Sequence, residues 1–196
     1  MKKLVMVLLV STVSVTSFAQ SKFSIGPTAG IGATMVSNID NSKGKMGANA
    51  GLSVVYSAVE HFGIGLDVKY SFEGAKWENN NVGSDLDLHY LRIPLKAIYF
   101  FGNYGHKVRP KIFAGPSFGI LSSAKLTTGT VETDLKSSAE SFDFGVLGGF
   151  GLNYRLVKNT WLNTDFTYTH GIKEVFNPGD ASNRSVMINF GVNFGL

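Results

Sequence analysis

The feature that most constrains this chain is a two-residue alternation of apolar positions with polar or glycine positions. Between Phe62 and Glu73 every even position is apolar, and the odd positions carry Gly, Asp, Lys, Ser and Glu. The stretch from Ser185 to Leu196 alternates in the same way, apart from Met187. Because successive side chains of a strand point to opposite faces, this pattern predicts strands with one apolar face and not helices.

Segments of this kind recur along the chain and predict eight strands, at residues 23–36, 48–58, 62–74, 86–101, 108–121, 141–154, 160–171 and 185–196. Each is at least as long as the roughly 9–11 residues that a tilted strand needs to cross a bilayer. Gaps of 3, 6 and 5 residues alternate with gaps of 11, 11, 19 and 13. Such spacing is typical of bacterial outer-membrane barrels. We therefore predict an all-β fold: an eight-stranded antiparallel up-and-down transmembrane β-barrel with short periplasmic turns and longer extracellular loops.

The positions of the charged residues indicate which face of the strands points to lipid. A soluble carrier barrel alternates too, but its apolar face points inward. Here the strand charges share the non-apolar phase with most strand glycines, and five are positive and five negative. A narrow interior requires such balance, because an unpaired buried charge is costly, and its small residues leave room for long side chains. We predict a lumen charge network of Asp67, Lys69, Glu73, Asp87, Arg92, Lys96, Arg109, Lys111, Asp143 and Asp165.

Some residues break the pattern. In segment 86–101 the apolar phase changes from even, at Leu86, Leu88 and Tyr90, to odd from Leu91 onward. This change predicts a β-bulge near Tyr90 and places the three even residues on the outer face. We expect bulges to accommodate the prolines as well, because a closed barrel has no free edge for them. These strand prolines are Pro27, Pro94, Pro110 and Pro116. Four apolar residues on the lumen phase are interpreted as filler: Val55, Phe113, Leu121 and Leu147.

Residues 1–19 have the pattern of a cleavable secretory signal peptide. Lys2 and Lys3 precede an apolar run, and Ser17-Phe18-Ala19 places small residues before the expected cut. The apolar run is too short to span about 30 Å of hydrocarbon. Residues 20–196 are then the barrel domain. Export together with a barrel pattern predicts the outer membrane of a Gram-negative bacterium, with outer-membrane lipid as the surrounding medium.

Three strand motifs resemble those of one family. Residues 90–95 read YLRIPL, residues 113–117 read FAGPS, and residues 142–149 read FDFGVLGG. In this order and spacing they resemble the Bacteroidetes outer-membrane β-barrel family, a porin-like group that includes PorT-type proteins. The resemblance covers essentially the whole mature chain. It implies an eight-stranded barrel and permits a role as an accessory component of protein secretion.

The last strand resembles the C-terminal signal that the outer-membrane assembly machinery reads. That signal combines a polar residue, a glycine, an aromatic residue and a final hydrophobic residue. The matching positions here are Asn189, Gly191, Phe194 and Leu196. The assembly machinery is therefore an expected partner.

The sequence contains few signs of catalytic or ligand chemistry. It has no cysteine, and none of the four histidines, His61, His89, His106 and His170, lies four residues from another. No Cys/His cluster, G-x-S-x-G motif or phosphate-binding loop is present. His170 falls near a membrane interface, but no serine lies two residues away on its face of the strand. We predict no catalytic, metal or cofactor-binding residues, no cofactor, and a protein that is not an enzyme.

The predicted loops at the long-loop rim are polar and nearly neutral, which gives no patch for nucleic acid. The longest, 122–140, is rich in Ser and Thr and is the expected contact for a surface partner. An eight-stranded interior is just filled by side chains, so no wide pore is expected, and we expect a monomer. The leading hypothesis is a structural or surface-interaction protein of the envelope. Accessory secretion protein and lipid-modifying enzyme remain as alternatives.

Overall fold

The computed structural model describes residues 22–37, 42–79, 82–175 and 181–196. The predicted signal peptide lies outside these residues. No helix among them is long and apolar enough to cross a membrane.

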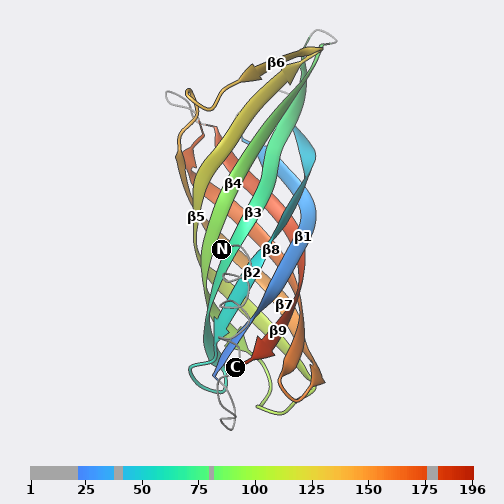
Figure 1. Cartoon of the computed structure of the whole chain (residues 1–196), viewed down its shortest axis with the longest axis vertical. Helices are drawn as coiled ribbons and strands as arrows, with labels where there is room; N and C mark the ends of the chain where they lie inside the picture. Colours follow the sequence, from blue (N-terminus) through green and yellow to red (C-terminus); the bar gives the residue numbers. More distant parts are fainter. Residues whose placement is uncertain (1–21, 38–41, 80–81, 176–180) are drawn as a thin grey trace, which may run out of the picture.

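The described chain forms one antiparallel sheet that closes on itself (Figure 1). Its strands are β1 (Phe23–Val36), β2 (Lys43–Tyr56), β3 (Phe62–Asn79), β4 (Val82–Phe100), β5 (Val108–Thr128), β6 (Val131–Asp134), β7 (Phe142–Val157), β8 (Thr160–Glu174) and β9 (Ser182–Gly195). Strands adjacent in sequence pair with each other, except that β5 pairs with both β6 and β7, and β9 pairs with β1 to close the barrel. The four-residue β6 lies outside the ring, so the barrel has eight strands, as predicted.

The alternation seen in the sequence becomes the two faces of the barrel wall. In β3, Ile64, Leu66 and Val68 are 40–52% exposed, whereas Asp67 and Ser71 are each only 3% exposed. Phe23 packs on Tyr56 and Phe62 on Tyr99 near one end of the barrel, with ring centroids 4.6 and 5.0 Å apart. An outer surface of large exposed apolar side chains with aromatic pairs near its edge suits a lipid environment.

The two ends of the barrel differ. At one end, called the turn end here, connections 57–61, 101–107 and 158–159 join the strands. At the other, the hairpin end, β3 and β4 remain paired as far as Asn79 and Val82, and β5 continues to Thr128 before returning as β6. These hairpins rise at the top of Figure 1. The predicted loops 75–85 and 122–140 are therefore largely strand. Alternation ends there because no lipid faces those residues, although backbone pairing continues.

Strand β4 corrects one prediction. Its even residues face inward from Leu86 to Phe100, so Leu86, Leu88 and Tyr90 are fully buried and not on the outer face. The register does shift between His89 and Tyr90, as predicted, but the extra residue is Ser122 in β5. The phase change in the sequence thus marks a change in the surroundings of the strand and not a change in its alternation.

The prolines are accommodated without bulges, which also differs from the prediction. The β1–β9 register resumes unshifted between the pairs Ile25↔Phe194 and Thr28↔Gly191, on either side of Pro27. The β3–β4 ladder likewise lacks two pairs at Pro94, and the β4–β5 ladder lacks two pairs at Pro116, and in both cases the register resumes unshifted. A missing N–H therefore opens the ladder locally, and the alternation on both sides maintains the register.

Gly74 occupies a position that other residues do not tolerate. Its φ is +146°, and a Cβ there would lie 1.9 Å from the carbonyl oxygen of Leu86. Gly83 lies in the opposite arm of the same hairpin, and a Cβ added there would have no neighbour within 4 Å. We predict that Gly74→Ala lowers the free energy of unfolding by about 1–3 kcal/mol. Gly83→Ala is the matched control and is expected to change it little. Urea titration in lipid vesicles measures both, and equal effects would contradict the prediction.

Candidate functional site

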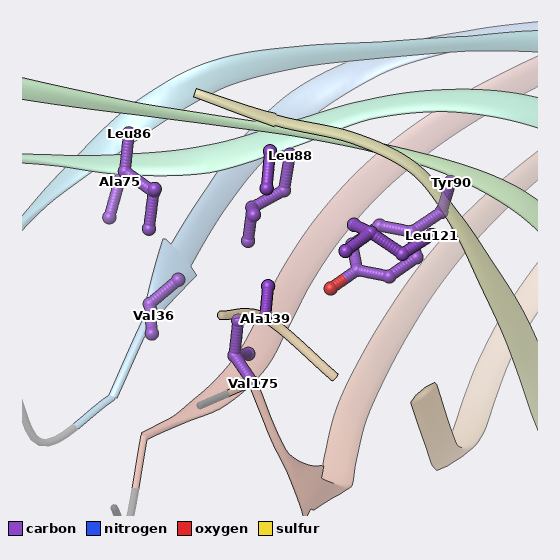
Figure 2. Close-up of a cluster of buried hydrophobic side chains, with 9 residues drawn as sticks. Val36, Ala75, Leu86, Leu88, Tyr90, Leu121, Ala139 and Val175 are labelled. Atoms are coloured by element: carbon purple, nitrogen blue, oxygen red, sulfur yellow. The ribbon is translucent and has the colours of Figure 1, made fainter. Parts of the chain in front are cut away.

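The barrel interior is filled in layers. At the hairpin end lies an apolar cluster made of Val36, Ala75, Leu86, Leu88, Tyr90, Leu121, Ala124, Ala139 and Val175. Figure 2 shows side chains from several strands and from the segments around Ala139 and Val175 converging there. Leu86, Leu88 and Tyr90 are at most 1% exposed. This hairpin-end cluster seals the lumen at that end.

Below the hairpin-end cluster lies the first part of the charge network. Arg92 donates from Nε to Glu73 Oε1 at 2.7 Å and from Nη2 to Oε2 at 2.6 Å. Its Nη1 donates to Asp143 on β7. The Arg92 guanidinium also lies 4.5 Å from the centre of the Tyr90 ring. One cation thus joins β3, β4 and β7 across the lumen, and Gly119 leaves room for it, since a Cβ there would lie 2.8 Å from Nη1.

A second set of ion pairs follows toward the turn end. Lys96 Nζ lies 2.8 Å from Asp67 Oδ2, and Lys69 Nζ lies 3.5 Å from the same oxygen. Lys111 Nζ lies 2.8 Å from Asp165 Oδ1. A second apolar cluster follows, made of Val55, Ile98, Phe100, Phe113 and Leu147. The residues interpreted as lumen filler are thus all buried, with Leu121 in the hairpin-end cluster.

Of the ten predicted lumen charges, the structure places nine inside the barrel. The exception is Asp87, whose side chain is 41% exposed and accepts a hydrogen bond from Lys45 Nζ at 2.5 Å. The prediction for Asp87 is wrong because it assigned the inner face of β4 to the wrong set of residues at the hairpin end. Asp87 belongs instead to a group of ion pairs that the sequence analysis missed, with Lys76–Asp85 at 3.2 Å and Lys43–Glu78 at 3.7 Å.

Without Asp87 the lumen charges no longer balance. Five cations face four carboxylates, and Arg109 is the cation that has no carboxylate within 4.0 Å among the described residues. Arg109 is only 5% exposed. Its Nη2 donates to the carbonyl oxygen of Glu60, but its Nε is buried and has no hydrogen-bond partner in the described part of the chain.

A cavity of about 360 Å³ opens beside Arg109 at the turn end. Lys22, Arg155 and Lys158 line it with Arg109, and Tyr104 and Trp161 contribute ring surface. Partial burial raises the pKa of the Tyr104 hydroxyl above its ordinary value. The sequence did not predict this cavity because its cations are far apart in the chain: Lys22 precedes β1, Arg109 and Arg155 lie near strand ends, and Lys158 lies in a turn. The available signal was the positive charge of these short segments.

Two of the four histidines contact tyrosine hydroxyls. The Nδ1 of His170 lies 3.3 Å from the Tyr168 hydroxyl. On the outer face, the Tyr70 hydroxyl lies 3.4 Å from both His89 Nδ1 and Ser122 Oγ, so a tyrosine hydroxyl stands between that histidine and serine. Within the described residues, no three His, Asp or Glu side chains are grouped to hold a metal ion.

The predicted assembly signal lies on β9, the strand that closes the barrel against β1. Asn189 is 6% exposed and faces inward, whereas Phe194 is 49% exposed on the outer face. Leu196 follows the strand and is 62% exposed. Recognition of these residues by the assembly machinery stays a prediction.

Comparison with known families decides where this barrel belongs. A family model described as an outer membrane protein beta-barrel domain matches residues 18–177. The chain belongs to this family. It is an outer-membrane barrel, and because such barrels have short periplasmic turns, the turn end faces the periplasm. The finer likeness to PorT-type proteins stays an expectation from the strand motifs.

Individual relatives are more distant. Outer membrane protein W of Salmonella typhi is 24% identical over 139 residues, which cover 71% of this chain and 64% of that protein's length. Neisserial surface protein A has a TM-score of 0.61 at 19% identity, covering 90% of this chain and 98% of that one. OprG of Pseudomonas aeruginosa has a TM-score of 0.61 at 13% identity, covering 89% and 95%. The outer membrane enzyme PagL has a TM-score of 0.52 at 18% identity, covering 85% and 97%. The structural likenesses show the fold alone.

The Arg92 cluster allows a direct test of charge compensation. Arg92→Met leaves Glu73 and Asp143 buried without their shared cation, so it is expected to lower the free energy of unfolding by about 3–5 kcal/mol. The triple variant Arg92→Met, Glu73→Gln, Asp143→Asn removes all three charges and is expected to recover most of that loss. Urea titration in lipid vesicles compares them. A triple variant as unstable as Arg92→Met would show that packing, and not charge, is responsible.

Proposed function

We propose that this protein is a barrel without a wide pore that acts in the outer membrane through its structure and its extracellular surface. The observation that carries the proposal is the filled lumen. Two apolar clusters and the ion pairs between them occupy the interior, and the hairpin-end residues Leu86, Leu88 and Tyr90 are almost completely buried. A route for solutes would have to displace well-packed side chains, so contact with the exterior falls to the outer surfaces.

The hairpin end offers a preorganised contact surface. β5 and β6 form a hairpin in which Lys125 Nζ lies 2.7 Å from Glu132 Oε1, and Val131 is 64% exposed near its tip. The chain then returns to the barrel, where Ala139 packs in the hairpin-end cluster. Segment 122–140, which we propose as the surface contact, is therefore fixed at one end by the pairing of β5 with β6 and at the other by the packing of Ala139. Holding a contact segment in place lowers the entropy cost of binding a partner.

Replacing the hairpin tip tests the surface role. A strain that lacks the gene is complemented with the wild-type chain, with Val131→Ser plus Glu132→Gln, or with Lys158→Gln at the turn end as a matched control. The measurement is the adhesion of whole cells to other cells or surfaces. We expect the tip variant to assemble normally but to fail to restore the adhesion that the wild-type chain restores, because its proposed contact site is altered. The control is expected to restore adhesion fully.

The other outcomes decide between the remaining roles. If the tip variant corrects every defect of the deleted strain, the role of the protein is structural and the hairpin is not a contact site. If the deleted strain is defective in secretion, the accessory role implied by the strand motifs replaces this proposal. A steady current through the purified protein in a planar bilayer, at the level of a diffusion pore, would contradict the filled lumen.

A further inference from the structure

The cavity at the turn end contains the one lumen cation that the ion-pair network leaves out, among the residues that the structure describes. The Arg109 guanidinium lies over two rings, with its carbon 4.7 Å from the centre of the Phe100 ring and 5.1 Å from that of Tyr104. Its Nε is buried and lacks a hydrogen-bond partner in the described chain. Aromatic stacking lowers the cost of burying a guanidinium, but a donor of this kind is best satisfied by an anion.

The rest of the lining is also cationic. Lys22, Arg155 and Lys158 join Arg109 in the wall, and no Asp or Glu of the described chain lines the cavity. None of these four side chains has a carboxylate within 4.0 Å among the described residues. Glu60 lies nearby: its main-chain carbonyl accepts a hydrogen bond from Arg109, and its Oε1 accepts one from the main-chain N–H of Tyr104 at 2.7 Å. A concave site lined by charge of one sign focuses the electric field and concentrates ions of the opposite sign.

The cavity also has apolar walls. Val55, Phe100, Tyr104 and Trp161 line it, and Arg155 lies 5.9 Å from the centre of the Trp161 ring. Val55 and Phe100 belong at the same time to the apolar cluster of the lumen. The cavity therefore ends at that cluster and is a blind site, not the mouth of a channel. Its volume of about 360 Å³ falls within the usual range for small-molecule sites.

We propose that this cavity binds a small organic anion with an apolar body, such as an aromatic carboxylate, from the periplasmic side. Arg109 receives the carboxylate through its free N–H groups, and Lys158 and Arg155 add attraction at the rim. The apolar body lies against Phe100, Tyr104 and Trp161. The inference is independent of the hairpin-end contact, because the two surfaces lie at opposite ends of the barrel.

Trp161 provides a reporter for this binding. The chain has two tryptophans, and Trp77 packs against the hairpin-end cluster, so a Trp77→Phe background leaves Trp161 as the single emitter. The mature protein in phosphatidylcholine nanodiscs is titrated with phenylbutyrate, and the neutral amide phenylbutyramide is the matched ligand. We expect a saturable change in Trp161 emission with phenylbutyrate and binding that is about tenfold or more weaker with the amide, a difference of about 1.4 kcal/mol or more. High salt is expected to weaken binding of the carboxylate.

Arg109→Gln is expected to weaken phenylbutyrate binding at least as much as removal of the ligand's charge does. Lys158 lies in a two-residue turn, so Lys158→Gln is not expected to disturb the fold. This substitution is expected to weaken phenylbutyrate binding less than Arg109→Gln does. Lys125→Gln removes an exposed cation at the far end and is expected to leave binding unchanged. Heat-modifiable gel migration confirms that each variant is folded. If Arg109→Gln fails to fold, Lys158→Gln together with Arg155→Gln provides the test.

Three results would overturn the proposal. Equal binding of phenylbutyrate and phenylbutyramide would show that the cavity does not recognise the negative charge of the ligand. Unchanged binding in folded Arg109→Gln, or in the double rim variant, would show that the anion does not meet these cations. Inorganic phosphate that binds as tightly as phenylbutyrate would show that the apolar wall contributes nothing, and that the site takes simple anions only.

Discussion

The structure depends on the confinement of charge to a narrow interior, where every described lumen ion except Arg109 forms an ion pair. Arg92 shows the constraint most clearly, because it satisfies Glu73 from β3 and Asp143 from β7 while lying on β4. Ionised groups in such a space are stabilised by pairing and hydrogen bonding. Two of the pairs, Arg92–Asp143 and Lys111–Asp165, tie together strands that are not neighbours in the sheet. The lipid-facing surface can then be uniformly apolar.

The same confinement explains the backbone. Long side chains inside a small ring require small residues opposite them, and Gly119 beside Arg92 is one such place. Close approach of neighbouring strands sets a second requirement, since a Cβ on Gly26 or Gly115 would lie 1.7 or 2.0 Å from a carbonyl oxygen. Both glycines directly precede a proline opposite which the pairing ladder opens without losing its register. The surplus of glycine is therefore a packing property of the barrel.

The alternation and charge phase of the sequence were sufficient to predict the eight-stranded barrel and nine of its lumen charges. They misplaced Asp87, Leu86, Leu88 and Tyr90, because the pattern identifies the outer face only where that face meets lipid. At the hairpin end the outer face meets water and carries ion pairs such as Lys76–Asp85, so apolar residues there mark the inside. The turn-end cavity escaped prediction because its cations, among them Lys22 and Lys158, come together only when the barrel closes.

The apolar residues on one phase of the strands face lipid, while a second, smaller set fills the lumen. Methyl NMR of the protein in nanodiscs that contain a lipid-soluble paramagnetic agent tests it without any substitution. We expect strong broadening of the methyl signals of Leu66, Val68 and Leu95, which are 40–43% exposed, and sharp signals for Val55, Ile98 and Leu147, which are at most 8% exposed. Broadening of the second set, with sharp signals from the first, would show that the two faces of the barrel wall are assigned the wrong way round.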